Sequence, residues 1–322
     1  MRKVAAILVV LLMVMVTAAG CVEEPKEEMS IKIVVPDGIT ALGAAKVIRD
    51  NPELADYVTV EYEIAKTPDV LASMIMSEDP GIAVVPSTLA AAAYNRGISY
   101  QLVGTMGWGS FYLLTTEDIN AWEDLKGEEI YNIGRGMTPD IVFRYLLEAN
   151  DIDAEEDVEL TYLAAATELA PTFIGGTSTV AVMPEPMLTT VMANVEEAEI
   201  VLDLNEEWKN LTDSNLGFPQ SSLIVKNELL EEHRPVVEAF VEYFADSVEW
   251  AKENPDSLVE YASDLEIGVP PIAIEESMAR ANQEYIAVRD SMSEYEIYYN
   301  AMFEYDPEVI GGKLPDEGLY DQ

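Results

Sequence analysis

The order of apolar and helical segments constrains the fold of this chain more strongly than any other feature. Short runs rich in Val and Ile alternate with segments of helical periodicity from residue 31 to residue 226. The same order recurs with a nearly constant offset: Pro36, which ends one apolar run, corresponds to Gly134, and Pro86 corresponds to Pro184. Units of this kind pair in parallel through right-handed crossovers. The sequence therefore predicts an α/β protein with two lobes of like topology.

The predicted elements follow from these periodicities. Strands, marked by short apolar runs, are predicted at Ile31–Val35, Val58–Ile64, Ile82–Val85, Tyr100–Gly104, Ile130–Ile133, Val180–Met183 and Glu199–Val201. Helices are predicted at Thr40–Asp50, Asp69–Ser77 and Ser87–Asn95, and mainly helical structure from Asn227 onward. Between Val236 and Val248, apolar residues recur at helical spacing, which predicts a helix packed on the core of the first lobe.

Two segments are predicted to cross between the lobes. Ser110–Thr116 would lead from the first lobe to the second, and Ser221–Lys226 would lead back. The first lobe is therefore predicted to hold residues 31–112 and 224–322, and the second lobe residues 113–223. A chain of 322 residues is long enough for two domains of roughly 100–200 residues each.

The amino-terminal segment has the features of a lipoprotein signal. Two basic residues precede the apolar run Val4–Val16, which is shorter than the roughly 20 residues of a membrane-spanning helix. Small residues then lead up to Cys21, the only cysteine. We therefore predict a signal peptide at residues 1–20, a lipid on Cys21 and a flexible tether at residues 21–30. The predicted location is the extracytoplasmic face of the cell membrane; an uncleaved membrane anchor is the alternative.

Charge and composition narrow the possible partners and chemistries. The chain carries 60 acidic and 18 basic residues, a formal net charge of −42, and such a surface repels nucleic acid. Its one histidine, His233, lies in a charged stretch at a predicted helix start, and no motif for a nucleophile, a phosphate loop or a metal site is found in the sequence. The sequence therefore predicts a non-enzymatic protein without a cofactor or a bound metal.

Four predicted loops lie at the carboxyl ends of strands, where open α/β sheets bind their ligands. They are Pro36–Thr40, Pro86–Thr88, Gly134–Asp140 and Pro184–Pro186. Hydroxyls at Thr40, Ser87, Thr88 and Thr138, with the free amides of helix starts, suit a carboxylate, a sulfonate or another electron-rich group. The alternative is that Thr40, Ser87 and Thr138 only cap their helices.

Other residues near these loops have two interpretations each. Trp108 lies between two glycines and is predicted to form an aromatic wall, although a purely structural role is the alternative. Asp37 and Glu185 would bind a ligand amine or remain solvated, and Arg135 would meet an anion or face solvent. The glycines around Arg135 lack the third glycine of a dinucleotide-binding fingerprint.

Six motifs are spread along the chain, at Val84–Ala90, Gly104–Gly109, Trp122–Gly127, Gly136–Asp140, Pro184–Pro186 and Ile310–Pro315. Together they resemble the nitrate/sulfonate/taurine-type solute-binding lipoproteins of ABC importers, a family whose members also bind thiamine-related pyrimidines. The most specific motif is Trp-Glu-Asp-Leu-Lys-Gly at residues 122–127. The resemblance covers nearly all of the chain after Cys21.

The resemblance implies a two-lobed type II periplasmic-binding-protein fold, in which the lobes close on a ligand about a two-strand hinge. It implies an ABC permease and an ATPase as partners, and ligand contacts at Thr40, Ser87, Trp108, Ser110, Gly136, Thr138 and Glu185. The resulting prediction is a monomeric solute-binding protein that captures a small organic or anionic solute by hinge closure. The identity of the solute stays open.

Two alternatives to this function remain. One is a surface-anchored receptor that senses or scavenges a small molecule without transport. The other is an exported enzyme. A related eukaryotic branch of the family uses histidine and cysteine of its own chain for catalysis, and the present sequence has no histidine in any of the four loops.

Overall fold

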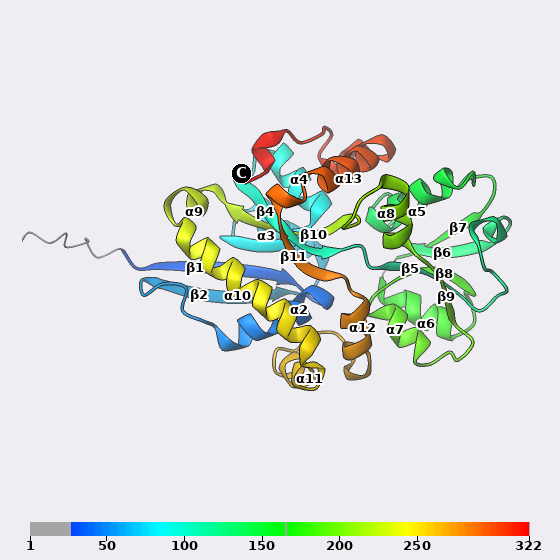
Figure 1. The fold of residues 1–322 in the computed structure, drawn as a ribbon, viewed down its shortest axis with the longest axis horizontal. Coiled ribbons are helices and arrows are strands. Elements are labelled where there is room, and N and C mark those ends of the chain that lie inside the picture. The colour runs from blue at the N-terminus through cyan, green and yellow to red at the C-terminus, as the bar shows by residue number, and fades with distance from the viewer. Residues whose placement is uncertain (1–26, 165, 322) are drawn as a thin grey trace, which may run out of the picture.

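The structure, a computed structural model, describes residues 27–164 and 166–321. The predicted signal peptide and Cys21 lie outside the described residues. Figure 1 shows two α/β lobes side by side along the long axis of the molecule, with helices on both faces of each sheet. The predicted two-lobed α/β fold is confirmed. Of the predicted tether, Met29 and Ser30 already belong to the first strand.

The first lobe contains a mixed sheet of six strands. In spatial order they are β11 (Gln283–Ala287), β4 (Tyr100–Trp108), β10 (Pro219–Lys226), β3 (Ile82–Pro86), β1 (Met29–Pro36) and β2 (Val58–Ala65). β1 pairs in parallel with β2 and β3, whereas β10 runs antiparallel to β3 and β4. The antiparallel pairing follows from the path of the chain, because β10 is the strand by which the chain returns from the second lobe.

The second lobe contains a mixed sheet of five strands. In spatial order they are β7 (Glu159–Leu163), β6 (Glu129–Ile133), β8 (Val180–Pro184), β5 (Phe111–Thr115) and β9 (Glu199–Asp203). β6 is parallel to β7 and β8, and β5 is antiparallel to β8 and β9. The two sheets therefore share one plan, a parallel core with an antiparallel strand from the crossing segment, as the internal repeat predicts.

The crossings between the lobes lie a few residues from their predicted positions. β4 ends at Trp108 and β5 begins at Phe111, so the first crossing is at residues 109–110. All of β10 from Pro219 pairs within the sheet of the first lobe, so the chain has returned before residue 219 and residues 219–223 belong to the first lobe. An apolar run shows that a strand is buried, but not which of two sheets it joins, and this is why the boundaries shift.

Helices cover both faces of each sheet. Those of the first lobe are α2 (Ile39–Asp50), α3 (Pro68–Met76), α4 (Ser87–Asn95), α9 (Asn227–Glu232), α10 (Arg234–Glu253), α11 (Pro255–Asp264) and α12 (Ile274–Arg280). Those of the second lobe are α5 (Thr138–Ala149), α6 (Leu169–Ile174), α7 (Met187–Met192) and α8 (Leu204–Thr212). The last helix, α13 (Met292–Tyr305), contacts elements of both lobes. Among the described residues, no helix combines the length and the apolar character needed to cross a bilayer.

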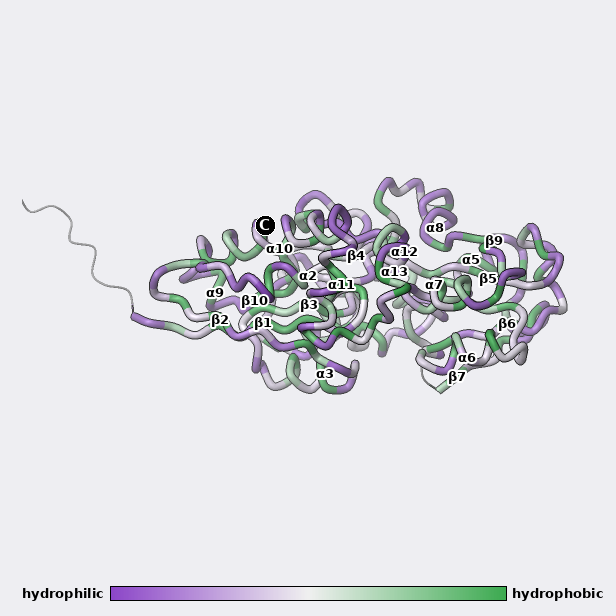
Figure 2. Tube along the Cα trace, turned by 90° about the horizontal axis from the view of Figure 1, so that it is seen from below, coloured by the Kyte–Doolittle hydropathy of each residue, from purple (hydrophilic) through white to green (hydrophobic). Residues whose placement is uncertain are grey.

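The helix predicted between Val236 and Val248 is α10, and its apolar residues pack as expected. Val236, Phe240, Phe244 and Val248 are all buried in the core beside α2. Figure 2 shows hydrophobic segments gathered along the strands of both lobes and hydrophilic segments in many of the outer loops and turns. The spacing of α10 is therefore that of a core helix.

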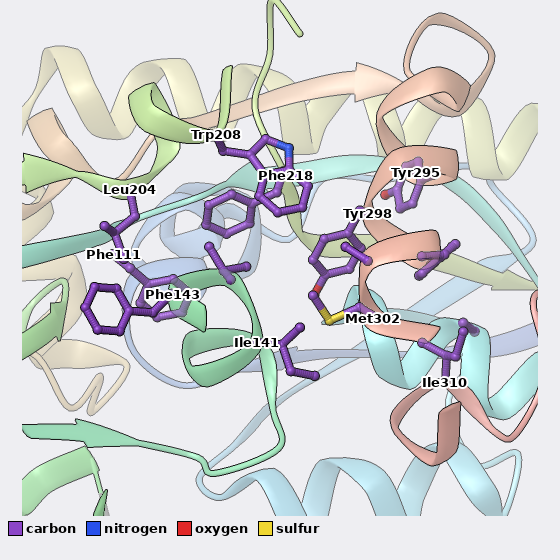
Figure 3. Close-up of a cluster of buried hydrophobic side chains, with 14 of the residues drawn as sticks. Phe111, Ile141, Phe143, Leu204, Trp208, Phe218, Tyr295, Tyr298, Met302 and Ile310 are labelled. Carbon is purple, nitrogen blue, oxygen red and sulfur yellow. The ribbon is translucent and has the colours of Figure 1, made fainter. Parts of the chain in front are cut away.

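One of the buried clusters is continuous between the lobes. It joins residues of α3 and α4 in the first lobe to residues of α5 and α8 in the second. Phe218, in the segment that leads into β10, stacks on Phe111 with ring centroids 6.0 Å apart, and on Tyr298 of α13 at 6.3 Å. Figure 3 shows Phe218 and Tyr298 near each other, with Trp208 beside Phe218. The two crossings and α13 thus share one aromatic core.

Gly109 makes room for this core. A Cβ built on Gly109 would lie 2.2 Å from the Phe218 ring, far inside van der Waals contact. We expect Gly109→Ala to lower the free energy of unfolding by about 1–3 kcal/mol, because overpacking forces the ring or the backbone to move. Urea denaturation followed by tyrosine and tryptophan fluorescence measures the change.

Gly175→Ala is the matched control for that substitution. Gly175 has an ordinary φ of −74°, and an added Cβ would come no closer than 3.1 Å to another atom. We expect a much smaller effect there. Equal effects at Gly109 and Gly175 would contradict the role assigned to the close contact with Phe218.

Candidate functional site

Four loops at the carboxyl ends of strands lead into helix starts, two in each lobe. β1 and β3 lead into α2 and α4, and β6 and β8 lead into α5 and α7. The residues that precede these helices, Gly38, Pro86, Met137 and Pro186, make no side-chain cap hydrogen bond. The first amides of a helix have no intrahelical partner, and they attract electron-rich groups. At α7 one of them is already engaged, because the Thr189 amide donates to Glu185 Oε2 at 3.2 Å.

None of the three hydroxyl residues expected at these helix starts acts as a cap. Thr40, Ser87 and Thr138 all lie inside the first turn of their helices rather than at the capping position. Thr40 is half-buried on α2, and Thr88 of α4 is 9% exposed. The capping interpretation of these residues therefore does not apply.

Ser87 lies below the surface of its loop. Its side chain is fully buried, and its hydroxyl is 2.8 Å from the hydroxyl of Ser222 on β10. The Ser222 hydroxyl is in turn 2.7 Å from the hydroxyl of Tyr295. In this structure the Ser87 side chain stabilises the packing of β3, β10 and α13, and the loop presents its backbone instead.

The two expected residues of the crossing segment are held by neighbouring elements. Trp108 is 3% exposed, and its indole Nε1 donates to the carbonyl oxygen of Glu284 at 3.3 Å. Ser110 donates from its amide and its hydroxyl to Gln220 Oε1, at 2.9 and 3.2 Å. Trp108 is thus packed inside the crossing rather than standing open as an aromatic wall.

The loop that begins α5 is ordered by one buried carboxylate. Gly134 and Gly136 have φ angles of 61° and 72°, which favour glycine. The Gly136 amide donates to Asp140 Oδ2 at 2.7 Å. The other Asp140 oxygen accepts from Arg144 Nε at 2.7 Å and from the Tyr162 hydroxyl at 2.6 Å. The turn around Gly136 is therefore rigid before any ligand arrives.

Arg135, at the tip of that turn, is exposed. Its guanidinium lies 5.4 Å from the centre of the Tyr162 ring, a cation–π contact. Within the part of the chain that the structure describes, no carboxylate forms an ion pair with Arg135. Arg135 is thus a cation without a carboxylate partner beside a helix start.

Glu185, by contrast, is fully engaged within the protein. Its buried carboxylate accepts from Arg280 Nε at 2.8 Å and from the hydroxyl of Thr189 at 2.9 Å. Arg280 ends α12, which belongs to the first lobe, and its carbonyl oxygen accepts from the Tyr112 hydroxyl of the second lobe at 2.6 Å. Burial lowers the pKa of Arg280, but the hydrogen bond and the charge of Glu185 outweigh it and raise the pKa above its usual value. The pair therefore joins the two lobes.

The charges at the four loops differ from those of the whole chain. The Asp37 carboxylate accepts from the Gly38 and Gly268 amides at 2.8 and 2.9 Å, and Lys66 lies 3.1 Å from it. Asp140 is neutralised by Arg144, and Glu185 by Arg280. Each of these three carboxylates has a cation beside it, whereas Arg135 forms no ion pair with a carboxylate of residues 27–164 or 166–321. The carboxylates of these loops are thus compensated locally, in a chain whose formal net charge is −42, and one further carboxylate lies nearby, because a Cβ on Gly136 would be 3.6 Å from Asp306 Oδ2.

The described residues 27–164 and 166–321 contain no group of three His, Cys, Asp or Glu side chains that could hold a metal ion. Several residues close to the loops were missed by the sequence analysis, namely Arg280, Gln220, Tyr295, Tyr298 and Tyr299. Tyr295, Tyr298 and Tyr299 have helical spacing, which predicts one buried face, but no local pattern indicates which loops that face would meet.

Comparisons with known proteins place this geometry in context. The sequence model of the family described as "Menaquinone biosynthesis" matches residues 55–302. No curated protein sequence shows a significant match. An ABC transporter structure from Parabacteroides distasonis is 25% identical and superposes with a TM-score of 0.80, over 92% of this chain and 99% of that one.

Two further structures share the fold at lower identity. The periplasmic aliphatic sulphonate binding protein of Escherichia coli is 12% identical, with a TM-score of 0.71 over 88% of this chain and 89% of that one. The periplasmic nitrate-binding protein of Synechocystis is also 12% identical, with a TM-score of 0.59 over 88% and 84%. The predicted type II periplasmic-binding-protein fold is confirmed.

The ion pair between the lobes generates a prediction. Arg280→Ala would leave the buried Glu185 carboxylate without a cation, so we expect the free energy of unfolding to fall by about 3–5 kcal/mol. Glu276→Ala is the control, because it removes an exposed carboxylate from the same guanidinium, and exposed pairs contribute only about 0–1 kcal/mol. Urea denaturation of both variants measures the difference. A loss at Arg280 no larger than that at Glu276 would show that Glu185 does not depend on its partner.

Proposed function

We propose that this chain, which belongs to the menaquinone biosynthesis family, is an extracytoplasmic solute-binding protein that captures a small organic anion between its lobes for an ABC importer. The observation that carries the proposal is the likeness to the ABC transporter structure, which extends over 92% of this chain and 99% of that one. Fold alone does not define a function. The chemistry of the four loops supplies the second part of the argument.

The loops suit an anionic or electron-rich group. The starts of α2, α4 and α5 carry amides without side-chain caps, and Arg135 is a cation without a carboxylate partner among the described residues. Thr40, Thr88 and Thr138 add hydroxyls from both lobes. A ligand that contacts loops of both lobes would favour the closed arrangement by its higher affinity for that state.

Location and partners form the rest of the proposal. A lipid on Cys21 would hold the protein at the outer face of the membrane, and two acyl chains anchor firmly where one is marginal. The protein would then act as a monomer beside a permease and its ATPase. A receptor that binds the same solute without transport is the alternative, and deletion of the gene separates them, because only the importer component would be needed for uptake.

A thermal-shift screen tests the binding proposal. Sulfonates, nitrate, carboxylates, amines and pyrimidines are compared, and an anion at about 100 times its dissociation constant should add about 2.7 kcal/mol of stability. We expect Arg135→Gln to weaken the binding of that ligand by roughly tenfold to a hundredfold, since a charge-assisted hydrogen bond contributes about 1.5–3 kcal/mol. Calorimetric titration of both proteins measures the affinity.

Arg96→Gln is the matched control in this experiment. Arg96 is exposed at the end of α4, away from the loop, and removal of its charge should leave the affinity unchanged. Stabilisation by amines alone, or by none of the five classes, would contradict the proposed ligand class. Equal losses of affinity in Arg96→Gln and Arg135→Gln would show that the ligand responds to the net charge of the protein and not to Arg135 itself.

The family description supports a second candidate, a role in menaquinone biosynthesis. In that case the site would hold a compound of this pathway, and it would either bind the compound or convert it. Incubation of the protein with each ligand found in the screen, followed by mass spectrometry, distinguishes the two. Recovery of the unchanged ligand supports binding, and a new product supports an enzyme.

Cys21 allows the proposed location to be tested separately. We expect Cys21→Ala to move the protein from the membrane fraction to the soluble fraction, because it removes the only cysteine that can carry the lipid. Solute affinity should stay the same, since the anchor is remote from the loops in sequence. Fractionation with immunoblotting measures the first effect and calorimetry the second. Retention of the variant in the membrane would favour an uncleaved anchor.

A further inference from the structure

Helix α13 contacts the first residues of two helices that lie in different lobes. Tyr299 of α13 donates from its hydroxyl to the carbonyl oxygen of Ser87 at 2.9 Å. The Tyr298 hydroxyl shares a hydrogen bond of 2.8 Å with Thr138 Oγ1. Ser87 is the first residue of α4 in the first lobe, and Thr138 is the first residue of α5 in the second. One rigid element therefore contacts the starts of both helices.

The contact with the first lobe is reinforced by a chain of buried hydroxyls. Ser87 Oγ, Ser222 Oγ and the Tyr295 hydroxyl follow one another at 2.8 and 2.7 Å. Thr105 Oγ1 donates to the same tyrosine oxygen at 2.9 Å. All four side chains are buried, and burial raises the pKa of Tyr295 to about 12, so its hydroxyl stays protonated at neutral pH. Hydrogen bonds in such a setting hold their partners firmly.

The contact with the second lobe rests on the aromatic core. The Tyr298 ring is stacked on Phe218, with ring centroids 6.3 Å apart and an interplanar angle of 12°, and it meets the edge of Trp208 at 6.4 Å. Figure 3 shows Tyr298 reaching from α13 toward these rings. The ring is thus held by the second crossing and by α8, which leaves the hydroxyl in a fixed place beside Thr138.

We propose that Tyr295, Tyr298 and Tyr299 are positioning residues, which set the separation between the starts of α4 and α5 in the free protein. Their effect on binding rests on the proposed function, whereas the separation itself does not. Helix starts that are fixed before the ligand arrives reduce the entropy lost on binding.

Electron paramagnetic resonance between two spin labels tests the separation without a ligand. Cys21 is the only cysteine, so a Cys21→Ser background accepts labels at Ser73→Cys on α3 and Ala149→Cys at the end of α5, both exposed. Tyr298→Phe keeps the stacked ring and removes the hydroxyl that contacts Thr138. We expect a longer or broader distribution of distances between the lobes. Thr138→Val removes the same bond from the other side and should give the same result.

Tyr305→Phe is the matched control. Tyr305 is also on α13, and its hydroxyl contacts Glu148 at the far end of α5, 2.6 Å away. We expect this variant to keep the wild-type distances. Unchanged distances in both Tyr298→Phe and Thr138→Val would overturn the proposal, and so would an equal change in Tyr305→Phe, because α13 would then only tie the lobes together.

Binding provides the second readout. With the ligand found in the thermal-shift screen, Tyr298→Phe should bind roughly threefold to tenfold more weakly, the effect of one lost hydrogen bond, while Tyr305→Phe binds as the wild type does. Changed distances with unchanged affinity would overturn the positioning role and leave the proposed function intact. Should the screen give no ligand, the distance measurement still decides the separation, so failure of the proposed function is told apart from failure of this inference.

Discussion

The close packing of Phe218 against Gly109 is the contact on which the arrangement of the lobes depends. Both crossings of the chain meet there, and the Gly109 amide donates to the Phe218 carbonyl oxygen at 3.1 Å. Since glycine has no Cβ, the ring can lie against the backbone and still stack on Phe111 and Tyr298. One buried cluster thereby continues from one lobe into the other. Separation of the lobes at this point would expose large aromatic surfaces to water. Such exposure costs about 25 cal/mol of free energy per Å² of apolar surface.

This shared core directs the C-terminal segment to both sides of the crossings. Figure 1 shows α13 on one side of the strands that join the lobes and α12 on the other. On the α13 side the contacts are aromatic, whereas on the α12 side the ion pair of Arg280 and Glu185 joins the lobes. The same ion pair neutralises a carboxylate of the loops. The same two residues therefore join the lobes and set the local charge at this loop.

The sequence was sufficient for the fold and for the position of the loops. Strand periodicity and the repeat of Pro36 at Gly134 depend on local properties of the chain, and these determined two α/β lobes with loops at the strand ends. Contacts between residues that are distant in sequence could not be predicted from these local properties. Glu185 and Arg280 are 95 residues apart. The local sequence around Glu185 therefore cannot show whether its carboxylate contacts a ligand or forms a buried ion pair. Ser87 is buried against α13, and Trp108 is buried against β11. Both elements are remote in sequence, so the burial of these two residues could not be predicted from their neighbours in the chain.

The two candidate functions require the same site but different chemistry within it. General acid–base conversion of a substrate uses a group whose pKa lies near the working pH. Burial raises the pKa of Tyr295 to about 12, and it also raises the pKa of Tyr298 above its usual value. These hydroxyls therefore stay neutral and act through hydrogen bonds. Arg144 remains charged beside Asp140, and Arg280 remains charged beside Glu185. These two ion pairs hold the loops in place. Groups that keep one protonation state while fixing the position of backbone amides are suited to recognition, and a conversion at this site would need a proton-transferring group other than these tyrosines.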